Sequence, residues 1–271
     1  MSTPPHRPSA APARLPERPS VRLFVEQPLG EGQPVTLSQM AAHYLFVVMR
    51  LGIGAQVALF DGKSGEWSAE ITEAGKKRGT ARCLAQTAPQ RDPPDLWLLF
   101  APIKKARTDF IVEKATELGA ARICPVQSDF TNAERIRRDR LQAHAIEAAE
   151  QCGGTFVPPV DELRPLFARL ADWPSGRLLY WADEALAGSG AALAPPPGAP
   201  APGPAAILIG PEGGFSPKER ARLAGLPFVR PMALGPRVLR ADTAAVAAIT
   251  LWQARFGDWG QAGFDPMEHP A

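Results

Sequence analysis

The sequence lacks several features that mark whole classes of proteins. Its 271 residues include three cysteines, at positions 83, 124 and 152, and no CxxC pair. This pattern argues against a disulfide framework or a zinc ribbon and fits a reducing compartment. No run of 18 apolar residues occurs, so we expect no membrane span. Together these absences predict a cytoplasmic protein.

The net charge and the content of aromatic side chains are also low. The formal net charge is +2, so the overall charge indicates no particular partner. Aromatic residues make up 7% of the chain, which does not indicate a base-stacking platform. Neither a GxGxxG dinucleotide motif nor a Walker phosphate loop occurs. Hydrophobic residues do make up 45%, enough for one large domain or two modest ones.

The composition changes along the chain and predicts two folded regions. Short β-like runs separated by turns predict a small antiparallel barrel over residues 20–88. Strand-like runs alternate with helical stretches over residues 95–257, which predicts an α/β domain with a mostly parallel sheet. Segments rich in Pro, Ala, Gly or Ser cannot build a core. We therefore expect a disordered tail at residues 1–19, a flexible insertion at 188–204 and a C-terminal tail at 258–271.

Within the α/β region, three stretches have helical character. The first two cover residues 105–118 and 133–151, and the last covers residues 242–256, where Asp242 is a possible cap. A fourth helix is expected after Ser216, because Pro217 and Glu219 complete a capping box. The character of residues 43–50, helix or strand, stays open.

The sharpest local motif is IGPEGGFS at residues 209–216. An apolar strand runs into three glycines within five residues and then into the capped helix. Glycines at the carboxyl end of a strand let a ligand approach the backbone, and ligands bind at that edge of open α/β sheets. A tight turn without a ligand explains the same residues.

A second motif, LGPRVLR at residues 234–240, also follows a short apolar run. Arg237 and Arg240 then precede an Ala-rich helix. They are either solvated charges or, because cations are mildly unfavourable at a helix start, partners of an anion.

Together the two motifs resemble the bacterial 16S ribosomal RNA uridine-N3 methyltransferases, a branch of the SPOUT methyltransferases. Further similar runs are EKATELG at 113–119, EAAEQCG at 147–153 and RLFV at 22–25. The resemblance covers roughly residues 20–256. The chain departs from the family pattern at Ala241 and Asp242, where relatives often have Thr and Glu, and at Gly154, where many have Arg.

The resemblance implies an N-terminal PUA-like barrel and a C-terminal SPOUT domain with a deep trefoil knot. It also implies S-adenosylmethionine as the cofactor, without a metal, bound mainly by backbone groups. The implied cofactor-binding residues are Leu208, Ile209, Gly210, Pro211, Glu212, Gly213, Gly214, Leu234, Gly235, Val238, Leu239 and Arg240.

The implied reaction is methyl transfer to N3 of a uridine. That nitrogen must lose its proton, and a nearby cation would stabilise the resulting negative charge, for which Arg240 is the catalytic candidate. Glu212 and Asp242 could accept the proton. A structural hydrogen bond to the loop backbone for Glu212, and a helix cap for Asp242, are the alternatives.

The implied partners are 16S rRNA, within the small ribosomal subunit, and a second copy of the chain in a homodimer. Residues 101–140 hold nine Lys and Arg against six Asp and Glu. By itself such a run indicates a solvated helix face, and phosphate contact gains support where further cations converge with it. The candidate RNA-binding residues are Arg22, Arg50, Lys104, Lys105, Lys114 and Arg135. A SPOUT enzyme for another rRNA or tRNA position, and a non-catalytic RNA-binding assembly factor, remain the alternatives.

Overall fold

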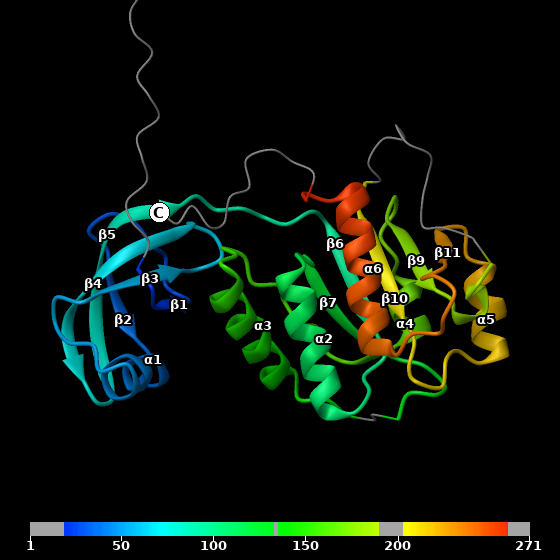
Figure 1. The fold of residues 1–271 in the computed structure, drawn as a ribbon, viewed down its shortest axis with the longest axis horizontal. Coiled ribbons are helices and arrows are strands. Elements are labelled where there is room, and N and C mark those ends of the chain that lie inside the picture. The colour runs from blue at the N-terminus through cyan, green and yellow to red at the C-terminus, as the bar shows by residue number, and fades with distance from the viewer. Residues whose placement is uncertain (1–18, 133–134, 190–202, 260–271) are drawn as a thin grey trace, which may run out of the picture. The chain divides into compact units, whose positions relative to one another are not determined.

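The computed structural model describes residues 19–132, 135–189 and 203–259. The chain divides into two compact units, Met1–Gln90 and Arg91–Ala271, and each has its own sheet and core (Figure 1). Most of both expected tails and of the expected insertion lies outside the described residues. Within the described ranges, no helix is both long and apolar enough to cross a bilayer.

The N-terminal unit is built on a five-stranded sheet with the order β1-β3-β4-β5-β2. Its strands are β1 (Arg22–Phe24), β2 (Pro34–Leu37), β3 (Gln56–Phe60), β4 (Glu66–Gly75) and β5 (Arg78–Ala88). The expected all-antiparallel arrangement is wrong in one place, because β1 pairs with β3 in parallel. β2 was not predicted; it is a four-residue edge strand that starts with Pro34, a position where a missing N–H is tolerated.

Most of residues 43–50, for which the sequence left helix or strand undecided, are helical. α1 (Gln39–His43) starts where the Ser38 hydroxyl accepts a hydrogen bond from Ala41 N at 3.1 Å, and it continues as the π-helix η1 (Tyr44–Val48). Ala42 and Leu45 are buried against the sheet core, whereas Met40 and Val48 are exposed. The segment is therefore helical, contacts β2 and β5 through α1, and leaves apolar side chains such as Met40 and Val48 exposed.

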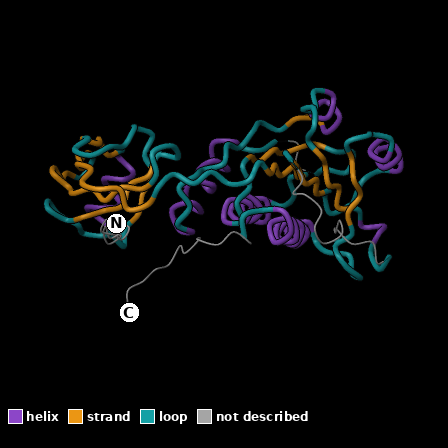
Figure 2. Tube along the Cα trace, turned by 90° about the horizontal axis from the view of Figure 1, so that it is seen from above, coloured by secondary structure: helices purple, strands orange, loops and turns teal. Residues whose placement is uncertain are grey.

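The C-terminal unit is built on a six-stranded parallel sheet with the order β11-β9-β10-β6-β7-β8. Its strands are β6 (Leu96–Phe100), β7 (Arg122–Gln127), β8 (Arg164–Pro165), β9 (Leu178–Ala182), β10 (Ala205–Ile209) and β11 (Val229–Met232). Helices cover both faces of this sheet (Figure 2). This arrangement explains the continuous apolar runs, since a strand buried on both faces has no solvent side.

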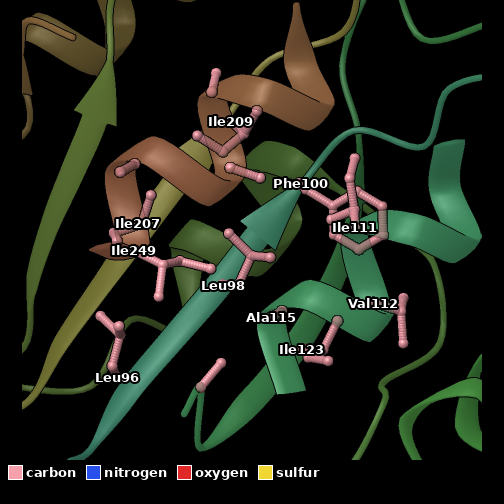
Figure 3. Packing of buried hydrophobic residues seen from close by; sticks show 14 of the residues in the cluster. Leu96, Leu98, Phe100, Ile111, Val112, Ala115, Ile123, Ile207, Ile209 and Ile249 are labelled. Atoms are coloured by element: carbon pink, nitrogen blue, oxygen red, sulfur yellow. The ribbon is translucent and has the colours of Figure 1, made fainter. Parts of the chain in front are cut away.

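Alternate side chains of each strand point to opposite faces. Leu98 and Ile207 pack against α2 (Lys105–Glu117), α3 (Arg138–Cys152) and α6 (Ala241–Phe256) (Figure 3). Leu99 and Leu208 pack on the other face, against α4 (Leu166–Ala171) and α5 (Pro217–Ala224). α4 was not predicted, because six residues are too few to show helical periodicity.

Two predicted helix starts are wrong. The helix expected from residue 133 begins at Arg138, because residues 135–137 are not helical and Arg137 is the N-cap. The last helix begins at Ala241 with Arg240 as N-cap, so Asp242 lies inside the first turn and does not cap it. There the Asp242 carboxylate still opposes the positive end of the helix dipole.

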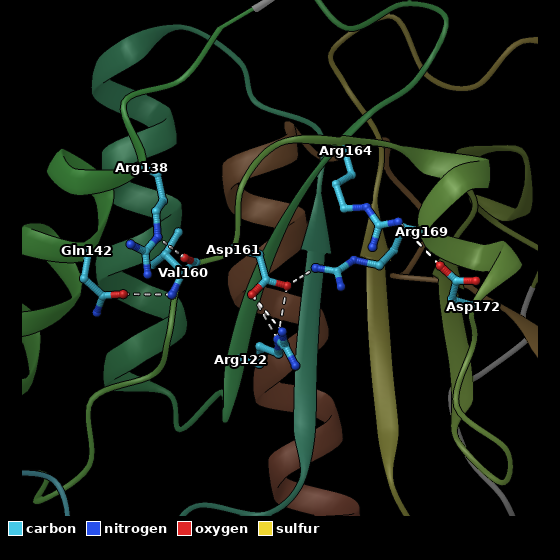
Figure 4. Close-up of polar contacts among 8 residues, drawn as sticks. All are labelled: Arg122, Arg138, Gln142, Val160, Asp161, Arg164, Arg169 and Asp172. Carbon is cyan, nitrogen blue, oxygen red and sulfur yellow. Dashed lines mark hydrogen bonds and ion pairs between the residues drawn. The ribbon is translucent and has the colours of Figure 1, made fainter.

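A network of hydrogen bonds and ion pairs joins the segment after α3 to the sheet (Figure 4). Asp161 accepts hydrogen bonds from Arg122 at 3.1 Å and pairs with Arg169 of α4. Arg138, at the start of α3, donates to Val160 O at 2.8 Å. Because the largely buried Asp161 bonds to both Arg122 and Arg169, the network helps to fix where α3 and α4 dock.

Candidate functional site

A pocket opens at the carboxyl edge of the parallel sheet, where β9, β10 and β11 end. The chain after each of these strands contributes a wall, and the cavity measures about 350 Å³, within the usual range for a small-molecule site. Its lining residues are Ala182, Asp183, Glu184, Ala187, Ile209, Gly210, Pro211, Glu212, Gly214, Leu234, Gly235, Arg237, Val238, Leu239, Arg240, Ala241 and Ala244. This edge is where open α/β sheets bind ligands.

The glycine loop, residues 210–214, is the first wall, and buried hydrogen bonds anchor it. The predicted capping box is present at the start of α5, where Glu219 accepts from Ser216 N at 2.9 Å. The other oxygen of Glu219 accepts from Asp129 N at 2.9 Å, and the Ser216 hydroxyl lies 2.6 Å from the Asp129 carboxylate. Glu219 is 3% exposed, so the loop after β10 is tied internally to the loop after β7.

Two positions of this loop require glycine. A Cβ on Gly210 would lie 2.7 Å from the Phe215 ring. Gly214 has φ +70, and a Cβ there would lie 2.5 Å from Oε1 of Glu184. The positive φ favours glycine at Gly214, and any other residue there would also displace the Glu184 carboxylate.

The second wall is the LGPRVLR segment after β11. Gly235 has φ +101, and its carbonyl accepts a hydrogen bond from Gly188 N at 3.2 Å. Arg237, Val238 and Arg240 are exposed. As the N-cap of α6, Arg240 lines the pocket with an extended backbone. The segment thus brings two cations to the cavity.

The third wall, after β9, was missed by sequence reasoning. Asp183 receives a two-point ion pair from Arg220, with contacts of 2.6 and 3.0 Å, and it also accepts from Ala185 N. Glu184 lies 3.4 Å from the same guanidinium. The sequence signal was available, because these two acids directly follow the apolar strand at residues 178–182, where a parallel strand presents ligand-binding groups.

Arg107 of α2 links two of the walls. Its Nη1 lies 3.8 Å from Glu212 Oε1 and 3.6 Å from Asp242 Oδ2. The expected hydrogen bond between Glu212 and the loop backbone is absent among the described residues; its carboxylate instead faces Arg107. The two candidate proton acceptors therefore share one cation, which sequence reasoning did not identify.

Most of the predicted cofactor-binding residues line this one cavity. Two do not: Leu208 is fully buried within β10, and Gly213 packs beside Phe130 instead of lining the cavity. Residues that line the cavity without having been predicted include Arg237, Ala241 and Ala244. The two sequence motifs therefore line one cavity, and the segment after β9, which was not predicted to belong to the site, lines it as well.

The predicted RNA-binding cations of the C-terminal unit fall into two groups. Lys104 and Lys105 are exposed after β6, and Arg135 is exposed after β7; these strands end at the same sheet edge as the pocket. Lys114 lies about 14 Å further along α2 than Lys105 and bonds to Glu117 at 2.7 Å. Lys114 is therefore engaged in a helix-surface pair away from that edge.

The two predicted cations of the N-terminal unit also differ. The Arg22 side chain is 7% exposed, pairs with buried Glu66 and lies 3.8 Å over the Phe60 ring. Arg50 is exposed and has φ 56, a conformation that is strained for a residue with a side chain. Arg22 holds the sheet together, whereas Arg50 is presented to solvent.

The thiols near the sheet offer no nucleophile. Burial in β7 raises the pKa of the Cys124 thiol to about 11, although Arg169 and Arg122 oppose the shift. Burial likewise raises the pKa of Cys83. Both thiols therefore stay protonated at neutral pH. Over the ranges that the structure describes, no cluster of three or more His, Cys, Asp or Glu is arranged to hold a metal ion.

Comparison with known proteins identifies both regions of the chain. Residues 90–253 match the RNA methyltransferase domain, and residues 41–82 match the RNA methyltransferase PUA domain. The ribosomal RNA small subunit methyltransferase E of Rickettsia conorii is 29% identical over 231 residues, which cover 84% of this chain and 93% of that protein. The Synechocystis protein of the same name is 30% identical over 222 residues, 79% of this chain and 71% of that protein.

A solved structure agrees with these matches. The ribosomal RNA small subunit methyltransferase E from Neisseria gonorrhoeae, crystallised with S-adenosyl methionine, aligns with a TM-score of 0.78 and 30% identity over 88% of this chain and 99% of that chain. A methyltransferase from Legionella pneumophila in complex with the same cofactor aligns with a TM-score of 0.74 and 29% identity, over 89% of this chain and 99% of that chain. The chain therefore belongs to the family of ribosomal RNA small subunit methyltransferases E, among the RNA methyltransferases that carry a PUA domain.

Proposed function

We propose that this protein transfers the methyl group of S-adenosylmethionine to N3 of a uridine in 16S rRNA of the small ribosomal subunit. The observation that carries the proposal is the pocket at the ends of β9, β10 and β11, with Arg240 in its wall. The names of the relatives support a ribosomal RNA substrate, and the cofactor in the Neisseria gonorrhoeae structure supports the ligand.

The residues of the pocket fit this cofactor. Ile209, Leu234 and Leu239 offer apolar surface for the adenine, and the glycines expose backbone groups that match its donor and acceptor edge. The carboxylates and guanidiniums offer partners for the polar end of the molecule. Bound there, S-adenosylmethionine would supply an electrophilic methyl group on a sulfonium.

The chain's own side chains would prepare the uridine. Arg240 stabilises the negative charge that develops on the base as N3 loses its proton. Glu212 and Asp242 are the candidate acceptors of that proton. Arg107 holds both carboxylates, at 3.8 and 3.6 Å, and so orients them at the same side of the pocket. The remaining task of the pocket is alignment of the two reactants.

The substrate would reach the pocket along the cationic edge of the sheet. Lys104 and Lys105 follow β6, and Arg135 lies between β7 and α3. These two strands end at the same sheet edge as the pocket, where the cations can contact phosphates. The PUA region, with exposed Arg50, is a second RNA-binding surface in this proposal. A substrate in the small ribosomal subunit would place the protein in the cytoplasm.

The finer details of the fold are part of the same proposal. The chain segments after β9, β10 and β11 would form the deep trefoil knot of the SPOUT class, and residues 20–88 would close into a PUA-like barrel. We further propose a homodimer. Leu251 of α6 is 44% exposed, so the helix has an apolar side chain outside its core-facing side. Analytical ultracentrifugation would test the dimer directly.

The experiment that tests the function supplies labelled S-adenosylmethionine with either assembled small subunits or naked rRNA, followed by mapping of the modified base. Label on a uridine N3 is the expected result. No label in either substrate would contradict the enzymatic proposal. Label on another base, or in tRNA, would favour a SPOUT enzyme of different specificity.

The alternative of a non-catalytic assembly factor makes a different prediction. Such a protein binds RNA without turnover and has no need for the cofactor. Titration with S-adenosylmethionine separates the two, because the proposed enzyme binds it and turns it over.

A further inference from the structure

The pocket contains a carboxylate that the proposed chemistry does not use. Glu184 is the first residue of the short helix η2 (Glu184–Leu186), directly after β9, and it lines the cavity. Its side chain is 40% exposed, whereas that of the adjacent Asp183 is 8% exposed. Glu184 is therefore the accessible member of this acidic pair.

The two acids differ in how far their oxygens are engaged. Both oxygens of Asp183 bind Arg220, and one also accepts from Ala185 N. Glu184 has one distant contact, from Arg220 to its Oε1 at 3.4 Å. Over the ranges that the structure describes, no hydrogen bond reaches its Oε2. Asp183 is engaged at both oxygens by the Arg220 ion pair, whereas Glu184 keeps more acceptor capacity toward the pocket.

The glycine loop is shaped around this carboxylate. A Cβ on Gly214 would lie 2.5 Å from Oε1 and 3.8 Å from Oε2 of Glu184. The absence of that Cβ lets the carboxylate lie directly on the loop backbone, among the groups assigned to the cofactor. Glu184 thus lies next to both Arg220 and Gly214.

We infer that the Glu184 carboxylate accepts hydrogen bonds from the vicinal hydroxyl groups of a ribose. The inference rests on the proposed function, so the ribose is that of S-adenosylmethionine. A carboxylate is an acceptor with two oxygens, and acidic side chains bind ribose hydroxyls in the same way in dinucleotide-binding folds. Glu184 directly follows β9, which pairs with β10, the strand that leads into the glycine loop. An acidic side chain at the end of a strand in the same sheet as a glycine-rich loop binds the ribose in dinucleotide-binding folds, and this position favours the ribose hydroxyls over the ammonium group of the amino-acid end.

Two nucleosides test this contact by calorimetric titration. S-adenosylhomocysteine has both the ribose and the amino-acid end, and 5′-deoxy-5′-methylthioadenosine has the ribose without the amino acid. The substitution Glu184→Gln should weaken the binding of both by about tenfold, because a hydrogen bond to a charged acceptor is lost. Glu162→Gln, at an exposed carboxylate outside the pocket, is the matched control and should change neither affinity.

A modified ligand gives a test on the unaltered protein. The 2′,3′-dideoxy form of methylthioadenosine should bind the wild type more weakly than the parent nucleoside, and Glu184→Gln should then have no further effect. Equal affinities of wild type and Glu184→Gln for the parent nucleosides would overturn the inference. Weakening for S-adenosylhomocysteine alone would also overturn it, because it would assign Glu184 to the ammonium group. If the wild type bound neither nucleoside, the proposed function itself would fail.

Discussion

The two motif-bearing walls of the pocket are held in place very differently. The glycine loop after β10 is followed by a reciprocal cap and is tied through buried Glu219 to Asp129 of another loop. The segment after β11 carries exposed Arg237 and Val238, the latter 71% exposed, and a hydrogen bond from Gly188 reaches it at Gly235. The first wall is anchored by buried hydrogen bonds, whereas the second keeps two cations exposed to solvent.

This difference suggests a division of labour. A loop whose conformation is fixed by buried hydrogen bonds presents backbone groups in a constant arrangement, which suits recognition of a cofactor. A segment with two accessible cations suits a polyanionic substrate that arrives from solvent. We therefore expect substitutions on the glycine-loop side to alter cofactor binding and stability, and substitutions after β11 to alter turnover.

The largest effect is expected from Arg240→Ala. If Arg240 stabilises the developing charge as proposed, its removal should lower kcat by about a hundredfold or more, with the affinity for S-adenosylhomocysteine unchanged. Single-turnover methylation and calorimetry measure the two quantities. Arg222→Ala, whose guanidinium lies over Phe167 outside the pocket, is the control. An equal loss of turnover and affinity would show that Arg240 is a cofactor-site residue. It would also contradict the expected division between the two walls, in which the segment after β11 affects turnover and the glycine loop affects cofactor binding.

The second-largest effect is expected on the free energy of unfolding. Glu219→Ala should lower the free energy of unfolding by about 2 kcal/mol, because two backbone N–H groups lose a buried charged acceptor. Urea denaturation measures the change, and Lys218→Ala at the exposed neighbouring position is the control. An unchanged midpoint for Glu219→Ala would mean that the glycine loop is not anchored as the structure indicates.

A smaller effect is expected from glycine substitutions. Gly214→Ala and Gly176→Ala both place a side chain at positive φ, but only the first meets a neighbour, Glu184. Each should cost about 1 kcal/mol of stability, and only Gly214→Ala should also weaken the binding of S-adenosylhomocysteine. If Gly176→Ala weakened binding equally, general destabilisation would explain the loss.

The smallest effect is a reactivity difference between thiols. With a pKa of about 11, roughly one Cys124 in a thousand is a thiolate at pH 8, and burial also blocks reagents. Iodoacetamide should therefore modify exposed Cys152 of the native protein and leave Cys124 intact, as peptide mass spectrometry would show. Cys124 lies in β7, the strand that leads to Asp129. Rapid modification of Cys124 would indicate that the anchored side opens in solution.

The parts of the site that could be predicted are those encoded locally. The capping box at Ser216 was predicted because Ser, Pro and Glu fall at fixed positions around one helix start. β10, the strand that leads into the glycine loop, was predicted because a strand buried on both faces is a continuous apolar run. The order of the strands in the sheet could not be predicted, because it depends on pairing between segments that lie far apart in the sequence.

The missed residues are those whose role depends on neighbours in space. Arg107 lies on a helix far in sequence from Glu212 and Asp242, and its position between them follows from how α2 packs beside β10 and α6. Asp183 and Glu184 belong to no motif by themselves; they line the pocket because β9 lies between β10 and β11. The wrong cap at Asp242 arose because a side chain that can cap a helix does so only from the residue before its first turn.

The shared acceptor at Glu219 has a consequence for hydrogen exchange. The backbone N–H groups of Asp129 and Ser216 donate hydrogen bonds to the two oxygens of the Glu219 carboxylate, although the two residues are 87 positions apart in the sequence. Departure of that carboxylate releases both amides at once, so their exchange with solvent deuterium should follow a single opening equilibrium. The two loops then behave as one cooperative unit, and a ligand that protects one amide from exchange should protect the other to the same degree.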